Sequence, residues 1–162
     1  MLNRLQNVFA SFRSHEVRYV VIGGVAAVLS GVPRATFDLD ILIEATPDNA
    51  GRLLAALTEA NFGTATLTSV EDLLAHEITV FKDRVRIDVQ TSAPGLTFDS
   101  AWQRREVMAY QGESFFVVCR EDLIASKRAA GRSRDLEDVR LLEQARDAGP
   151  EVDGREFDEL LQ

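Results

Sequence analysis

The feature that most limits how this chain can fold is a pair of aspartates inside an apolar run, Phe37-Asp38-Leu39-Asp40-Ile41-Leu42-Ile43. The run is typical of a β-strand, in which alternate side chains share a face, so Asp38 and Asp40 point the same way with Cα atoms about 7 Å apart. Two like charges at that spacing repel each other and resist burial unless a positive charge lies between them. A divalent cation is the natural candidate, because hard cations bind carboxylate oxygens. The alternative is a solvated strand end, since Asp-X-Asp also occurs in loops.

A double glycine precedes this acidic strand. Residues 18–22 form a short β-rich run, Gly23 and Gly24 follow it, and residues 25–30 have helical composition. In a strand, glycine, helix arrangement the backbone N–H groups at the helix start can face a phosphate, and glycines allow a close approach. An ordinary tight turn is the alternative interpretation of the same two residues.

A third carboxylate lies on a later strand. Residues 84–90 alternate polar and apolar side chains, with Asp88 on the polar face. Taken alone, Asp88 is a solvent-facing residue. If its strand lies beside the strand of Asp38 and Asp40, it completes a cluster of three carboxylates.

The periodicity predicts an α+β fold, with a mixed sheet, interleaved helices and a C-terminal helical pair from about residue 120, in a single domain over residues 1–162. We expect helices at 2–15, 25–30, 47–61, 120–131 and from 133 to about 149, and strands at 18–22, 37–43, 64–68, 77–81, 84–90, 106–110 and 113–118. The last helix should have Ser133 as its cap and turn Leu136, Val139, Leu141 and Leu142 inward. In the acidic tail from residue 151, Phe157, Leu160 and Leu161 are candidates for docking as a final helical turn.

Charge and composition limit the class of protein. The net charge of −8 argues against broad, sequence-independent binding to a polyanion, although it leaves room for a local basic patch. No apolar stretch is long enough to span a membrane, and the N-terminus lacks the apolar core of a signal peptide. The lone Cys119 has apolar neighbours that predict a core position rather than a nucleophile. These features together predict a cytoplasmic protein.

Three blocks of the chain resemble the signature of the nucleotidyltransferase superfamily typified by DNA polymerase β. They are Ile22-Gly23-Gly24, then Asp38-Leu39-Asp40, then Ile87-Asp88-Val89. Within the superfamily the chain looks most like the small bacterial AbiEii-type nucleotidyltransferases of abortive-infection systems. That likeness rests on Arg34-Ala35-Thr36 before the acidic pair and on a late block with Asp122-Leu123-Ile124, Lys127, Arg132 and Arg134-Asp135. It covers about residues 20–142.

The resemblance implies a nucleotidyltransferase fold and the transfer of a nucleoside monophosphate from a nucleoside triphosphate to an acceptor, with release of pyrophosphate. It implies Mg²⁺, as two ions, or Mn²⁺, held by Asp38, Asp40 and Asp88, with Asp88 also drawing the proton from the acceptor hydroxyl. It implies a nucleotide site made by Gly23, Gly24, Arg34, Thr36, Lys127 and Arg132, with Lys127 also catalytic. For the basic residues the alternative is ordinary surface charge, and Asp135 is expected to hold one of them in a salt bridge.

Three functions remain open at this point. The first is a toxin-like enzyme that modifies a tRNA or a protein hydroxyl and is paired with an antitoxin protein. The second is an antibiotic-modifying nucleotidyltransferase, and the third is a non-catalytic nucleotide-binding or partner-binding module. The complete set of Asp38, Asp40 and Asp88 favours an enzyme.

Overall fold

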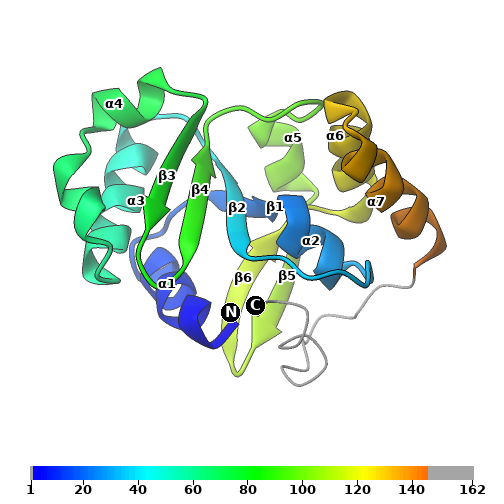
Figure 1. Cartoon of the computed structure of the whole chain (residues 1–162). Helices are drawn as coiled ribbons and strands as arrows, with labels where there is room; N and C mark the ends of the chain where they lie inside the picture. The colour runs from blue at the N-terminus through cyan, green and yellow to red at the C-terminus, as the bar shows by residue number, and fades with distance from the viewer. Residues whose placement is uncertain (1, 146–162) are drawn as a thin grey trace.

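The structure is a computed structural model and describes residues 2–145 (Figure 1). In chain order its elements are α1 (Leu2–Ser14), β1 (Tyr19–Ile22), α2 (Gly23–Leu29), β2 (Asp38–Ile43), α3 (Pro47–Glu59), the 3₁₀ helix η1 (Gly63–Leu67), α4 (Val70–Ala75), β3 (Ile78–Lys82), β4 (Arg86–Gln90), α5 (Phe98–Gln103), β5 (Glu106–Tyr110), β6 (Glu113–Val117), α6 (Arg120–Ala130) and α7 (Ser133–Gln144). The predicted α+β class, with interleaved helices and a C-terminal helical pair, is confirmed. The final helical turn expected after residue 151 lies outside the described residues.

The six strands form one mixed sheet in the order β3-β4-β2-β1-β6-β5. β1 runs antiparallel to β2 and parallel to β6, while β2 runs parallel to β4. The outer strands β3 and β5 pair antiparallel with β4 and β6. The strands that carry the three aspartates, β2 and β4, therefore lie side by side, and β1, which leads into the double glycine of α2, lies next to β2.

Apolar packing decides which face of β2 is turned toward solvent. Leu39, Ile41 and Ile43 are fully buried on one face. On the same side, Phe9 of α1 stacks on Phe115 of β6 and on Tyr19 of β1, and the Ser11 hydroxyl donates to the Ala56 carbonyl of α3 at 2.7 Å. Because side chains alternate along a strand, sealing this face leaves Asp38 and Asp40 on the other.

Helices also flank the acidic face of the sheet. α2 follows β1 without a linker and contacts β1, β2 and α6, and α6 packs against α7. Figure 1 shows α6 and α7 together at one end of the molecule, away from α3 and α4. No helix within residues 2–145 combines the length and the apolar character needed to cross a bilayer.

The strand predicted at residues 64–68 is wrong, because the segment forms η1 instead. Its alternating threonines imitate a strand pattern. In the structure the hydroxyls of Thr66 and Thr68 donate to the carbonyls of Gly63 and Thr64, at 2.7 and 3.0 Å. Such local side-chain bonds satisfy the backbone of a helical turn and compete with strand pairing.

The start, end and inner face of α7 also differ from the prediction. Arg132 is the N-cap, because its backbone N–H donates to the Asp135 carboxylate, and Ser133 is the first helical residue. The helix ends at Gln144 rather than near residue 149. Its buried residues are Asp135, Asp138, Val139 and Leu142, so Leu136 points outward and is 51% exposed.

Candidate active site

All the residues that the sequence predicts for the site lie around one cleft of about 630 Å³. They are Gly23, Gly24, Arg34, Thr36, Asp38, Asp40, Asp88, Lys127 and Arg132. They come from the start of α2, from the loop before β2, from β2 and β4, and from α6 and the start of α7. The cleft therefore lies between the centre of the sheet and the C-terminal helical pair.

Strand register brings the carboxylates into one row. Asp40 of β2 is paired directly with Asp88 of β4, and Asp38 is paired with Arg86. Neighbouring strands lie about 4.8 Å apart, and paired residues point to the same face. Asp38, Asp40 and Asp88 all line the cleft, so the predicted placement of Asp88 on the face of the other two aspartates is confirmed.

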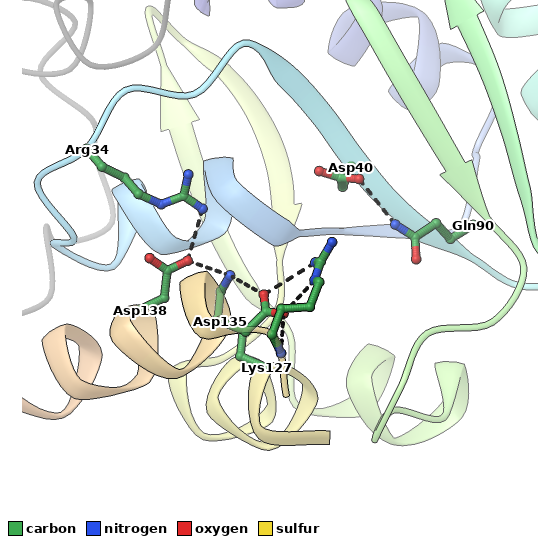
Figure 2. Close-up of polar contacts among 7 residues, drawn as sticks. Arg34, Asp40, Gln90, Lys127, Asp135 and Asp138 are labelled. Carbon is green, nitrogen blue, oxygen red and sulfur yellow. Dashed lines mark hydrogen bonds and ion pairs between the residues drawn. The ribbon is translucent and has the colours of Figure 1, made fainter. Parts of the chain in front are cut away.

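The electrostatic effect of this row is largest at Asp40, whose pKa is raised. Burial and the nearby carboxylates of Asp88 and Asp38 raise the pKa of Asp40 to about 6. The side-chain amide of Gln90 donates to Asp40 at 3.2 Å, and this bond and the charge of Lys127 act in the opposite direction (Figure 2). Asp40 is therefore short of positive charge, which a bound cation would supply.

Arg86 supplies the nearest positive charge to Asp88 and Asp38. Its Nε and Nη2 atoms donate to the two carboxylate oxygens of Asp88, at 2.7 and 3.0 Å. The same Nε lies 4.0 Å from Oδ2 of Asp38. The guanidinium thus stands as a cation between two of the predicted metal ligands.

The donor set fits a hard divalent cation in its chemistry but not in its present arrangement. Carboxylate oxygens are the ligands that Mg²⁺ and Mn²⁺ prefer. As the side chains stand, no three His, Cys, Asp or Glu residues among 2–145 lie close enough together to hold a metal ion. A cation bound by Asp88 requires the Arg86 guanidinium to move away, and a side chain that is 43% exposed has room to do so.

The double glycine is needed because of what lies against it. Gly23 has a φ of +67°, and a Cβ atom there would lie 2.6 Å from Oδ2 of Asp40. A Cβ atom on Gly24 would lie 2.6 Å from the hydroxyl oxygen of Thr36, which is itself buried. A larger residue at position 23 would collide with Asp40, and one at position 24 would collide with Thr36.

We expect Gly23→Ala to destabilise the protein by about 1–3 kcal/mol, because alanine is strained at positive φ and its Cβ collides with Asp40. Denaturant unfolding measures this change. Gly51→Ala is the matched control, because Gly51 lies inside α3 and its nearest neighbour to an added Cβ is 4.0 Å away. Alanine there should stabilise by up to about 1 kcal/mol. Equal effects of the two substitutions would contradict the crowding of Gly23 against Asp40.

The raised pKa of Asp40 predicts a pH dependence of stability in metal-free, chelated buffer. Because the folded-state pKa is about 6 and the ordinary value is 3.8, the folded chain binds the proton more tightly than the unfolded chain. Stability should therefore fall as pH rises from about 4 to 6 and stay low above that range. Asp40→Asn resembles the protonated acid and should remove this loss, so that the variant is more stable than the parent at pH 7 by at most about 3 kcal/mol, less where water reaches the carboxyl.

Unfolding free energies of parent and variant, compared from pH 4 to 7, isolate the acidic row, because the titrations of groups away from the row cancel in the difference. A constant difference across the range would disagree with the raised pKa.

The basic residues of the cleft are held by two buried carboxylates of α7 (Figure 2). Oδ2 of Asp138 accepts from Nζ of Lys127 at 2.7 Å and from Nη2 of Arg34 at 2.9 Å. Nζ of Lys127 also lies 3.8 Å from Asp135. Lys127 is 6% exposed and Asp138 only 2%, so this is an internal network that joins the loop before β2 to α6 and α7.

Arg132 and Asp135 form the outer part of the same network. Nε of Arg132 donates to Asp135 at 2.7 Å, which confirms that Asp135 holds one of the basic residues. Burial acts to raise the pKa of Asp135, but the hydrogen bond and charge of Arg132 hold it below its usual value. Arg128 points elsewhere and pairs with Glu143.

Sequence reasoning missed three residues of the site: Arg86, Gln90 and Asp138. Arg86 and Gln90 lie two residues on either side of Asp88, so the strand period already put them on its face. Asp138 lies three residues after Asp135, a helical spacing that puts both on one face of α7. Apolar periodicity identifies a buried helix face by its hydrophobic residues and therefore does not indicate that a carboxylate such as Asp138 is buried there.

Comparison with known proteins places the chain in a family. A family model described as "Nucleotidyltransferase of unknown function (DUF6036)" matches residues 2–145. No curated protein matches the chain.

Proposed function

The chain belongs to the DUF6036 family of nucleotidyltransferases, and from this premise we propose that it is a metal-dependent enzyme that transfers a nucleoside monophosphate from a nucleoside triphosphate to an acceptor hydroxyl. The observation that carries the proposal is the row of three carboxylates beside a glycine cradle in one cleft. The residues that border this row on each side indicate where the triphosphate and the acceptor bind.

The triphosphate belongs on the glycine side of the row. Gly23 and Gly24 line the cleft, Arg34 lies beside Gly24, and Lys127 is joined to Arg34 through Asp138. Phosphate oxygens are bound by such backbone groups together with cations. Thr36 holds the backbone here by packing against Gly24, and Arg132 lies at the start of α7 on the same cleft.

Asp38, Asp40 and Asp88 would hold the metal ions, Mg²⁺ or Mn²⁺. Divalent ions at such a site neutralise charge on the phosphate oxygens and favour the deprotonated acceptor oxygen. The acceptor oxygen attacks the α-phosphorus, the bond from that phosphorus to the bridging oxygen of the β-phosphate breaks, and pyrophosphate leaves. Asp88 takes the proton of the acceptor hydroxyl, because it is the carboxylate farthest from the glycine cradle.

The other side of the row is bordered by β3, where the acceptor must approach. Val80 is paired with Asp88 and Ile78 with Gln90, so both apolar side chains share the acidic face, and both are about half exposed. Lys82 continues the same face beside Arg86. An exposed apolar wall of this kind suits a macromolecular acceptor, RNA or protein, better than a small antibiotic. The antibiotic-modifying function is therefore not favoured.

Labelled nucleoside triphosphates incubated with Mg²⁺ and either total RNA, cell protein or an aminoglycoside test the proposal. Label on RNA or protein that is lost in Asp38→Ala would support it. If triphosphate binds but no acceptor gains label, the chain is a binding module instead. Growth arrest on expression that depends on Asp38, and that is relieved by a co-expressed partner protein, would extend the proposal to a toxin with an antitoxin.

A further inference from the structure

Arg86 lies where the proposed function needs a metal ion, against Asp88 and Asp38. Both carboxylate oxygens of Asp88 accept from this one guanidinium. Register pairs Arg86 with Asp38, so the guanidinium is positioned by the sheet against both aspartates. A guanidinium that donates two hydrogen bonds to one carboxylate forms one of the stronger side-chain ion pairs.

We propose that Arg86 is a built-in counter-ion that competes with the divalent metal for Asp88 and Asp38 and gives way when the nucleoside triphosphate binds. The inference rests on the proposed function, because it concerns the same carboxylates. It assigns to Arg86 a positioning role, in which the side chain keeps Asp88 oriented and its charge balanced while no nucleotide is present.

The geometry supports an exchange rather than a permanent pair. Asp88 is largely buried, but the side chain of Arg86 is 43% exposed and begins β4, directly after the turn that joins β3 to β4. The guanidinium can therefore rotate into water or toward an incoming phosphate without disturbing the core. The pair of Lys127 and Asp138 differs, because both of its partners are buried.

The exchange of Arg86 for the metal ion is coupled to binding of the triphosphate. The acidic row attracts a metal ion, but the ion can bind Asp88 only if the ion pair between Arg86 and Asp88 breaks. Without nucleotide, the loss of that pair is not compensated. A triphosphate brings anionic oxygens to which the freed guanidinium can bind, so the loss is compensated only when nucleotide is present. Metal and nucleotide should therefore strengthen each other's binding, and Arg86 should account for part of that coupling.

The test measures Mn²⁺ binding by the electron paramagnetic resonance signal of free Mn²⁺, first without nucleotide and then with a triphosphate that cannot turn over, each compared with the same mixture without protein. Arg86→Gln should bind Mn²⁺ about three- to tenfold more tightly than the parent chain, because the competing cation is gone. Adding a triphosphate with a methylene group in place of its α,β-bridging oxygen should tighten Mn²⁺ binding more in the parent than in Arg86→Gln.

Two further variants separate competition from a general effect of charge. Lys82→Gln removes a positive charge from the register partner of Arg86 on the same face, with no ion pair to the aspartates among the described residues. It should change Mn²⁺ affinity much less than Arg86→Gln. Arg86→Lys keeps the charge but loses the two-pronged bond, and should fall between the parent and Arg86→Gln.

The outcomes distinguish this inference from the function on which it rests. Equal Mn²⁺ affinity in the parent and Arg86→Gln, with binding lost in Asp88→Asn, would overturn the role of Arg86 and leave the metal site standing. Weaker binding in Arg86→Gln would overturn it as well, because Arg86 would then support the site. Absence of Mn²⁺ binding in both chains would overturn the metal site and this inference together.

Discussion

Asp40→Asn should lower nucleotide transfer by about 10³-fold or more and leave the fold intact. Asp40 is the central carboxylate, paired with Asp88 on β4 and touching the glycine cradle on the other side. Losing its charge removes a metal ligand, and metal stabilisation of the transferring phosphate contributes several kcal/mol, each 1.36 kcal/mol being tenfold in rate. Because asparagine relieves the buried charge, the variant should be at least as stable as the parent at pH 7.

Opposite changes in activity and stability distinguish a functional residue from a structural one, because a residue retained for stability would lower both when replaced. Initial rates of label transfer and denaturant unfolding of the same preparation measure the two quantities. Asp83→Asn is the matched control, since Asp83 is an exposed aspartate in the turn between β3 and β4. It should change neither quantity appreciably. Transfer by Asp40→Asn within about threefold of the parent rate would remove Asp40 from the proposed chemistry.

Asp138→Ala should be the most destabilising substitution in the cleft, by about 3–5 kcal/mol. One oxygen of Asp138 accepts from both Lys127 and Arg34, and the carboxylate is 2% exposed. Removing it leaves the buried Lys127 ammonium with only the more distant Asp135. Transfer should fall as well, because Lys127 and Arg34 lose the group that aims them into the cleft.

A second substitution separates the cost of the unpaired charge from the loss of packing. Adding Lys127→Met to Asp138→Ala should recover part of the stability, because the buried ammonium is gone, but should recover no transfer activity. The matched control is Glu143→Gln in α7, the helix of Asp138, which breaks the exposed pair with Arg128 of α6 and should cost less than about 1 kcal/mol. If Asp138→Ala were as stable as Glu143→Gln, the ion pairs of Asp138 with Lys127 and Arg34 would contribute little to the free energy of unfolding.

Local pattern was sufficient for most elements and for the side chains that form the acidic row. The helix, strand and turn signals of α1, β1, α3, the β5–β6 hairpin and α6 were read correctly, because each has its own period or cap. The segment at Thr64 to Thr68 was misread, because alternating β-branched residues suit both a strand and a threonine-bonded 3₁₀ turn. Only contacts beyond the segment decide between the two.

The sequence by itself determined that Asp38 and Asp40 share a face, that Asp88 lies on the polar face of its own strand, and that glycines stand before them. These are consequences of a two-residue period and of the room that a residue without a side chain leaves. Only the tertiary structure decided that β4 lies next to β2 with Asp88 beside Asp40, that Arg86 pairs with Asp88, and that Asp138 is buried under Lys127 and Arg34. The periodicity of a helix or strand fixes the face on which each of its residues lies. Which elements become neighbours depends on how distant segments bury their apolar faces together.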